Sequence, residues 1–223
     1  MTQGEMRQER SRGKGNRSAQ LFALAGIVGP IFFVLMFTID GWLSPDYSPL
    51  RQTVSSLGAT EPNAWIQNSN FVVFGLLLLA FAVGFSRQMR AVLSREALRT
   101  STLLLVLTGA GLVNDGFFTQ DSVTTLHGLL HALGFLVIFA SLIVALFLIG
   151  RHLSPIAAWR GYGWYSTITG LVTLGLLIIS AFLADPLQLA GLFQRILAVE
   201  AFAWYVVMGG RLFALARAQT GTH

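Results

Sequence analysis

Four long stretches without a charged residue most constrain how this chain can fold. They are residues 18–39, 62–86, 122–150 and 161–184. Each exceeds the roughly 20 residues that an α-helix needs to cross the hydrocarbon core of a bilayer. Charged residues make up only 11% of the chain and the mean hydropathy is +0.65, whereas about a quarter of a typical soluble chain is charged. We therefore predict an all-α integral membrane protein.

Two weaker apolar spans complete the predicted bundle. One covers about 99–118 and contains Asp115, and the other covers about 191–214 and contains Arg195 and Glu200. With them the sequence predicts six transmembrane helices in one membrane domain, residues 19–215. The helices are expected at about residues 20–41, 65–85, 99–118, 124–149, 160–183 and 191–214.

The positions of the basic residues predict how the bundle is oriented. Thirteen of the fifteen lysines and arginines fall in the two terminal segments and in the second and fourth connections; they are Arg7, Arg10, Arg12, Lys14, Arg17, Arg87, Arg90, Arg95, Arg99, Arg151, Arg160, Arg211 and Arg217. Basic residues accumulate on the cytoplasmic side of a membrane. We therefore expect both termini in the cytoplasm and the protein in the plasma (inner) membrane. The net charge of +5 then reflects topology, and no nucleic-acid partner is expected.

The segments outside the helices are short, with one exception. Residues 1–18 are rich in Arg, Gly, Ser and Gln and predict a disordered basic tail, and residues 216–223 predict a short second tail. The long connection is residues 42–64, on the predicted outer side, where Thr-Val-Ser-Ser-Leu is expected to form a short helix ended by Gly58. The chain has no cysteine, which excludes disulfides and thiolate metal sites.

Polar residues gather in the predicted outer half of the bundle. They are Asp40, Asp115, His127, His131, Arg195 and Glu200, and the inner half has no comparable set. A charge at membrane depth costs several kcal/mol unless it is paired or hydrated. The asymmetry therefore predicts a polar site that faces a cavity or a partner in the outer half.

The two neighbouring histidines lie on one face of the predicted fourth helix. His127 and His131 are one turn apart, and Gly134, Ile138 and Ser141 continue the same stripe. A stripe that contains Gly and Ser is expected to face other helices rather than lipid.

A zinc site is one interpretation of these residues. Two imidazoles one turn apart, with Asp115 from a neighbouring helix, suit Zn²⁺, and an open fourth position could activate water. The pattern is loosely similar to the His-x-x-x-His motif of membrane ceramidases and progestin-receptor-like hydrolases, which have seven helices and a further histidine that this chain lacks. It predicts a zinc-dependent intramembrane hydrolase acting on a lipid. Ser55 and Ser56 would be nucleophiles only if the outer connection folded over His127; serines in such a stretch more often cap turns.

Two further interpretations stay open. In one, Arg195, Glu200, Asp115 and Asp40 bind a lipid, a small acidic ligand or an ion, with Arg195 holding an anionic group. In the other, the same side chains pair between helices, and the protein is a structural or partner-subunit membrane protein without chemistry. Ligand binding is the leading hypothesis, and the sequence does not assign an enzyme activity.

Three runs of the sequence resemble a known membrane family. They are SSLGATEPNAWIQNSNFVVFGLLLLAFAVGF, LHGLLHALGF and GLFQRILAVEAFAWYVVMGGRL. They are similar to the bacterial and archaeal family called domain of unknown function 998, and the similarity extends over roughly residues 20–215. The family's Ser-x-Leu-Gly, His-Gly-x-x-His-like and Gln-Arg motifs correspond here to Ser56, Gly58, His127, His131, Gln194 and Arg195. The resemblance implies a multi-pass membrane protein and implies no activity.

Overall fold

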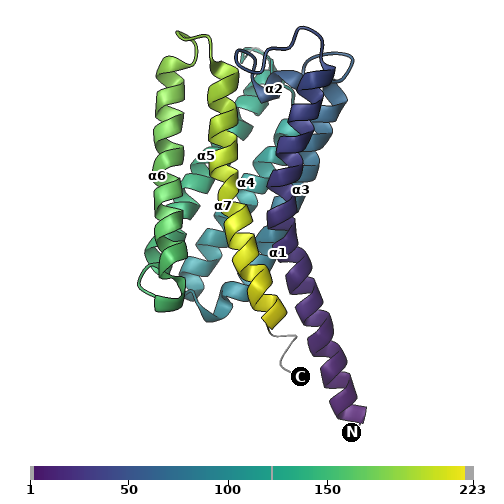
Figure 1. Cartoon of the computed structure of the whole chain (residues 1–223), viewed down its shortest axis with the longest axis vertical. Coiled ribbons are helices and arrows are strands. Elements are labelled where there is room, and N and C mark those ends of the chain that lie inside the picture. The colour runs from purple at the N-terminus through teal and green to yellow at the C-terminus, as the bar shows by residue number, and fades with distance from the viewer. Residues whose placement is uncertain (1–2, 122, 219–223) are drawn as a thin grey trace.

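The described part of the chain, residues 3–121 and 123–218 of a computed structural model, is built from helices (Figure 1). Seven are α-helices and two are short 3₁₀ helices. In chain order they are α1 (Gln3–Leu43), α2 (Val54–Leu57), α3 (Ala64–Gln88), η1 (Met89–Ala91), α4 (Arg95–Phe117), α5 (Leu126–Leu153), η2 (Ala157–Trp159), α6 (Arg160–Leu183) and α7 (Ala190–Ala218).

Six of these helices are long and apolar enough to cross a membrane, namely α1, α3, α4, α5, α6 and α7. This confirms the predicted all-α, six-helix membrane architecture. The helix ends lie within four residues of the predicted ones, except at the start of α1. A disordered tail was predicted there, whereas in the structure the helix extends back to Gln3. No proline precedes Pro30, so no residue in this stretch blocks helix formation. The rest of the two predicted tails, residues 1–2 and 219–223, lies outside the described residues.

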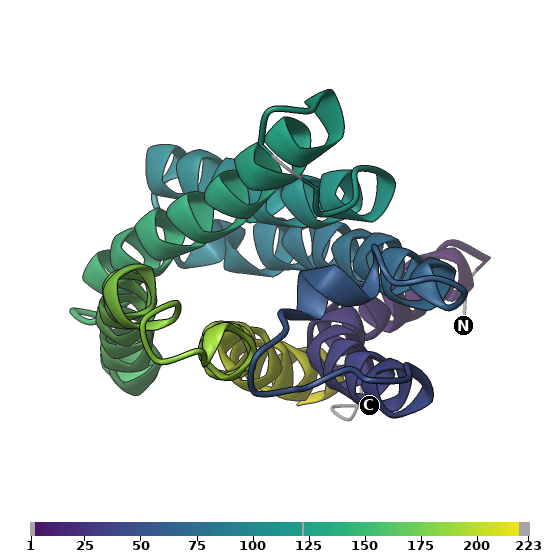
Figure 2. The same ribbon diagram turned by 90° about the horizontal axis from the view of Figure 1, so that it is seen from above.

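The six long helices form a closed ring (Figure 2). Helices that follow one another along the chain pack together from α3 to α7, and α1 closes the ring by packing against both α3 and α7. The two ends of the chain lie at one end of the bundle (Figure 1). We call this the basic end, because Arg90 in η1 and Arg95 at the start of α4 lie there. The opposite end, which carries α2 and residues 44–63, is the loop end.

Aromatic side chains fill the centre of the ring. Phe33 of α1 stacks on Phe74 of α3 with ring centroids 4.7 Å apart, and Phe202 of α7 meets Phe74 edge-on at 4.9 Å. Trp204 is fully buried and donates a hydrogen bond of 2.8 Å from its indole nitrogen to the Ser166 hydroxyl of α6. These contacts connect α1, α3, α6 and α7 through rigid groups.

Helix α6 is the least embedded member of the ring. Its buried residues are small or hydroxylic and extend no further along the chain than Thr173. In its second half, Ile178 is 52% exposed and Phe182 is 72% exposed. This half of α6 therefore presents an apolar surface suited to lipid.

Small residues bring α3 and α4 into close contact. A Cβ atom added to Gly75 would lie only 2.6 Å from the carbonyl oxygen of Gly109, which is backbone and cannot turn aside. Two residues further along α4, on another face of the helix, a Cβ on Gly111 would meet Ile138 of α5 at 2.7 Å. The absence of side chains at these positions sets the spacing of α3, α4 and α5, three of the helices that line the site described below.

We predict that Gly75→Ala destabilises the bundle by about 1–3 kcal/mol, because α3 and α4 must separate to admit the methyl group. The matched control is Gly175→Ala on α6, where an added Cβ meets no atom within 4 Å. Thermal unfolding in detergent should show a lowered midpoint for the first variant and an unchanged or raised midpoint for the second. Equal midpoints would contradict the close contact.

Candidate functional site

Two adjoining hollows lie at the loop end of the ring. The inner one has a volume of about 30 Å³, and the outer one, which we call the vestibule, has about 270 Å³. Ser55, Phe135 and Gln194 line both, so the two spaces adjoin. The inner hollow, which we call the chamber, is further lined by Phe33, Val54, Phe71, Leu112, Asp115, Ile138, Phe139, Ala198 and Phe202. The vestibule is further lined by Thr53, Gln120, Asp121, Val123, Gly128, His131 and Ala132.

Asp115 contributes a carboxyl group to a chamber that is otherwise mostly aromatic and aliphatic. It lies in the last turn of α4 and is 2% exposed. The Asn114 side-chain amide donates to its Oδ1 at 3.2 Å and also to the Leu130 carbonyl of α5 at 2.8 Å. A Cβ on Gly134 would collide with this carboxyl group and with Asn114, so the glycine in α5 makes the room that Asp115 occupies.

His131 lies beside Asp115 and faces the vestibule. Its Nδ1 is 2.8 Å from the Phe118 carbonyl oxygen and 3.8 Å from Asp115 Oδ1. Because a carbonyl can only accept, Nδ1 carries the proton in the hydrogen bond to Phe118. In the neutral ring Nε2 then has a free lone pair, and no described residue donates to it. His131 can therefore accept a hydrogen bond or a proton from a molecule in the vestibule.

His127 is separated from this pair. It lies in the first turn of α5, is exposed, and packs its ring edge-on against Phe118 at 5.5 Å. The other four members of the predicted stripe, His131, Gly134, Ile138 and Ser141, are all buried. The stripe is therefore buried from His131 onward, while its first member is exposed.

The predicted zinc ligands are thus only partly assembled. Among residues 16–121 and 123–218, no three side chains of histidine, aspartate or glutamate converge where they could hold a metal ion. His131 and Asp115 are adjacent, and His127 would have to turn away from Phe118 to join them.

Arg195 anchors the loop-end segment onto α7. Its Nη1 donates to the carbonyl oxygens of Pro49 at 2.7 Å, Gln52 at 3.0 Å and Gly191 at 3.0 Å. Its Nη2 donates to the Tyr47 hydroxyl. The guanidinium also lies over the ring of Tyr47, 5.4 Å from the centroid. Arg195 lines neither hollow, and its role toward an anionic ligand stays a prediction.

Tyr47 links Arg195 to the residues just before α2. Its hydroxyl donates to the Thr53 carbonyl at 2.8 Å or the Gln52 carbonyl at 3.1 Å, while it accepts from Arg195. Burial raises the pKa of the Tyr47 phenol above its ordinary value, and the hydrogen bond from Arg195 opposes the rise. The phenol therefore keeps its proton and its donor function at neutral pH.

Gln194 fixes α2 above the chamber. Its side-chain oxygen accepts from the Val54 backbone N–H at 2.5 Å, and its side-chain nitrogen donates to the Ser55 hydroxyl at 3.2 Å. Thr53 caps α2 by accepting from the Ser56 N–H, and its hydroxyl donates to Gln120 at 2.7 Å across the vestibule. The predicted short helix ended by Gly58 is confirmed. Ser55 accepts from Gln194 and His131 bonds Phe118, and no hydrogen bond joins Ser55 to His131 among the described residues, so the structure does not show them as a nucleophile–base pair.

The remaining two predicted acids lie outside the hollows. Glu200 is half-buried between α7 and α6, where the Thr173 hydroxyl donates to it at 2.7 Å. Asp40 is fully buried in the last turns of α1, and neither of its carboxylate oxygens has a hydrogen-bond partner among the described residues. Of the six predicted polar residues, only Asp115 and His131 face the hollows.

Several lining residues could not be found from the sequence. Thr53 and Gln120 are common polar residues in connections, and only the folding of residues 44–63 and of the α4–α5 connection over the bundle brings them to the vestibule. Gln194 was marked by the Gln-Arg motif, but its role depends on a partner some 140 residues away in the chain.

The comparisons with known proteins assign a family. The model of the family described as "Protein of unknown function (DUF998)" matches residues 27–211. The chain belongs to the DUF998 family. No curated protein and no solved structure matches it. Two of the motifs that suggested DUF998 contact each other in the structure, since Gln194 of the Gln-Arg motif bonds Ser55, which begins the Ser-Ser-Leu-Gly run.

We predict that Arg195→Ala releases residues 47–55 from the bundle. The Pro49 and Gln52 carbonyl groups would lose this charged donor, and a hydrogen bond to a charged group contributes about 1.5–3 kcal/mol. Backbone amide hydrogen exchange in this segment should accelerate by about tenfold or more, because local opening becomes easier. Arg51→Ala, which removes an exposed arginine from the same segment, is the matched control and should leave exchange unchanged. Identical exchange in the two variants would rule out the anchoring role.

Proposed function

We propose that the protein binds a lipid head group or a small amphipathic molecule in the vestibule and chamber. The observation that carries the proposal is the carboxyl group of Asp115 in the wall of a chamber otherwise lined mostly by phenylalanine and aliphatic residues. The polar vestibule in front of it is bordered by Ser55, Gln194 and His131. Ligand sites in proteins are commonly apolar hollows with a few convergent polar groups.

The volumes limit what enters each space. A water molecule needs roughly 10–15 Å³ of such volume, so the chamber of about 30 Å³ admits a group of two or three heavy atoms. The main part of a ligand would occupy the vestibule of about 270 Å³. Both spaces together approach the lower end, about 300 Å³, of ordinary small-ligand pockets.

The charges favour a ligand that donates hydrogen bonds. The charged residues among the lining are Asp115 and Asp121, both acidic. Arg195 would reach an acidic ligand only by leaving the three carbonyls that it now bonds. A hydroxyl or ammonium group at Asp115 therefore fits better than a carboxylate or phosphate.

We predict that Asp115→Asn lowers the amount of co-purifying ligand by at least about tenfold, the effect of 1.4 kcal/mol of lost binding. Native mass spectrometry of the purified chain, followed by extraction and identification of small molecules and lipids, gives the occupancy. Asp46→Asn is the matched control, because it removes an exposed carboxylate at a positive-φ position that asparagine tolerates. An equal loss in both variants, or none in Asp115→Asn, would count against the proposal.

A zinc-dependent hydrolase acting on a lipid is the second candidate, supported by the 3.8 Å approach of His131 to Asp115. Metal analysis of protein purified without chelator separates the two candidates. The hydrolase requires stoichiometric zinc that is lost in both His127→Ala and His131→Ala. The binding proposal expects ligand occupancy to follow Asp115 whether or not a metal is present.

We further propose that the bundle lies in the plasma membrane with the loop end outside and both termini in the cytoplasm. The proposal is supported by the thirteen basic residues on the side of the termini.

The absence of native cysteine allows a direct test of this topology. Glu61→Cys at the loop end should react with a membrane-impermeant maleimide in intact cells, because Glu61 is exposed there. Glu96→Cys, an equally exposed position at the basic end, should react only after the cells are permeabilised. The reverse labelling pattern would refute the orientation.

A further inference from the structure

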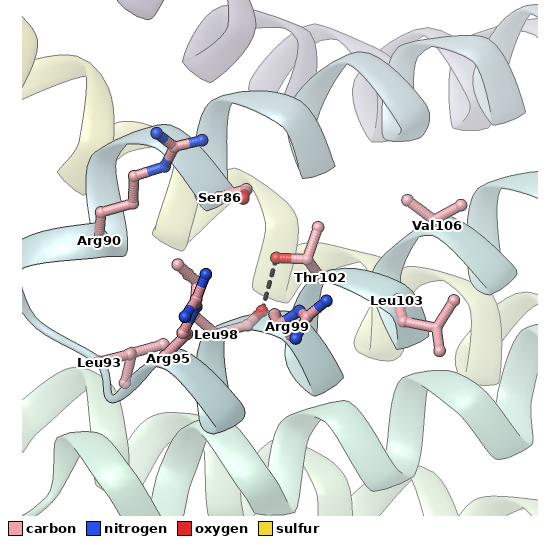
Figure 3. A pocket seen from close by; sticks show the side chains of 9 residues that line it. All are labelled: Ser86, Arg90, Leu93, Arg95, Leu98, Arg99, Thr102, Leu103 and Val106. Carbon is pink, nitrogen blue, oxygen red and sulfur yellow. Dashed lines mark hydrogen bonds between the residues drawn. The ribbon is translucent and has the colours of Figure 1, made fainter.

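A large hollow at the basic end combines arginines with apolar residues (Figure 3). It has a volume of about 870 Å³ and lies between the end of α3, η1 and the first half of α4. Arg90 lies on the α3–η1 side, and Arg95 and Arg99 lie on α4 (Figure 3). The other lining residues are Ser86, Leu93, Leu98, Thr102, Leu103 and Val106. It is at the opposite end of the bundle from the vestibule.

We infer that this hollow binds an anionic phospholipid, with the phosphate among Arg90, Arg95 and Arg99 and an acyl chain along α4. Within the described residues none of the three guanidinium groups has a carboxylate at ion-pair distance. Guanidinium groups match the geometry of phosphate oxygens and bind them through paired hydrogen bonds.

The residues along α4 change from charged to apolar in the order that a phospholipid requires. Arg95, Arg99, Leu103 and Val106 follow one another at helical spacing on the side that lines the hollow. Leu103 is 58% exposed, so its side chain is available to a lipid chain. Val106 lies about 10 Å along the helix axis from Arg99, which is within the reach of an acyl chain from its head group.

The general excess of arginine at this end does not account for the hollow. Arg87 packs over the Phe22 ring at 4.9 Å, and Arg211 packs over the Trp159 ring at 5.2 Å. Those two side chains are held by aromatic partners, whereas Arg90, Arg95 and Arg99 share one concave surface. Glu96 is the nearest acid in the sequence and lines an adjoining hollow with Arg95 and Arg99. Three arginines against one glutamate leave the surface positive.

The experiment uses the full chain, purified in detergent and titrated with phosphatidylglycerol or phosphatidylcholine under native mass spectrometry. The unmodified chain should prefer phosphatidylglycerol. The double variant Arg95→Gln/Arg99→Gln should lose about 25-fold in affinity for it, since each arginine near an anionic lipid contributes roughly fivefold. Arg151→Gln/Arg160→Gln removes the same charge from exposed positions at the same end and should change affinity by less than threefold.

Each other result would overturn the inference. An equal loss in both double variants would mean diffuse attraction by the whole basic end. Equal binding of soluble glycerol phosphate would mean an anion site that does not recognise lipid. Thermal unfolding of each variant shows whether it is folded. The variant Leu103→Asn keeps every arginine, and it should also weaken phosphatidylglycerol binding while leaving the binding of glycerol phosphate unaffected. Unchanged lipid binding in that variant would remove the acyl-chain contact from the proposal.

Discussion

The bond network around Arg195 is the interaction on which the loop end of this protein depends. Residues 44–53 have no regular secondary structure, so their backbone groups depend on partners outside a helix. The first turns of α7 supply the missing donors. Arg195 serves Pro49 and Gln52, and the backbone N–H groups of Gly191 and Leu192 donate to Arg51 and Leu50. The bonds from Gly191 and Leu192 also give acceptors to N–H groups that have no partner within the first turn of α7. The loop segment and the start of α7 thus satisfy each other's backbone hydrogen bonds.

The two hollows follow from this attachment. Gln194, next to Arg195, holds Val54 and Ser55, and these residues form the side of the chamber that α2 contributes. A Cβ on Gly191 would lie 2.5 Å from the Pro49 carbonyl, so the absence of a side chain there lets the segment lie flat on α7. In the ligand site that we propose, the wall formed by α2 is therefore held in place by side chains of α7.

Several polar side chains within the bundle are paired between helices, which is one way a membrane protein tolerates them. Asn70 of α3 donates to the Phe33 carbonyl of α1 at 3.0 Å, and the hydroxyls of Thr108 and Ser141 bond at 2.9 Å between α4 and α5. Glu200 with Thr173 belongs to the same class and joins α7 to α6. Asp115 differs, because Asn114 and His131 approach it on one side while its carboxyl group also borders an open space.

The sequence by itself determined the six helices, their approximate ends and the short helix ended by Gly58, because charge-free length and turn residues are local properties of the chain. It also marked Asp115 and His131 as polar residues in the half of the bundle that holds the site, since their depth follows from helical rise alone. Only the tertiary structure decided which polar residues meet. His127 and His131 share a helix face, yet the packing of neighbouring elements covers only the second, so His127 is exposed and His131 is buried. Arg195, which looked like a ligand-binding group, found its partners in backbone carbonyls nearly 150 residues away in sequence, and no local pattern encodes so distant a contact.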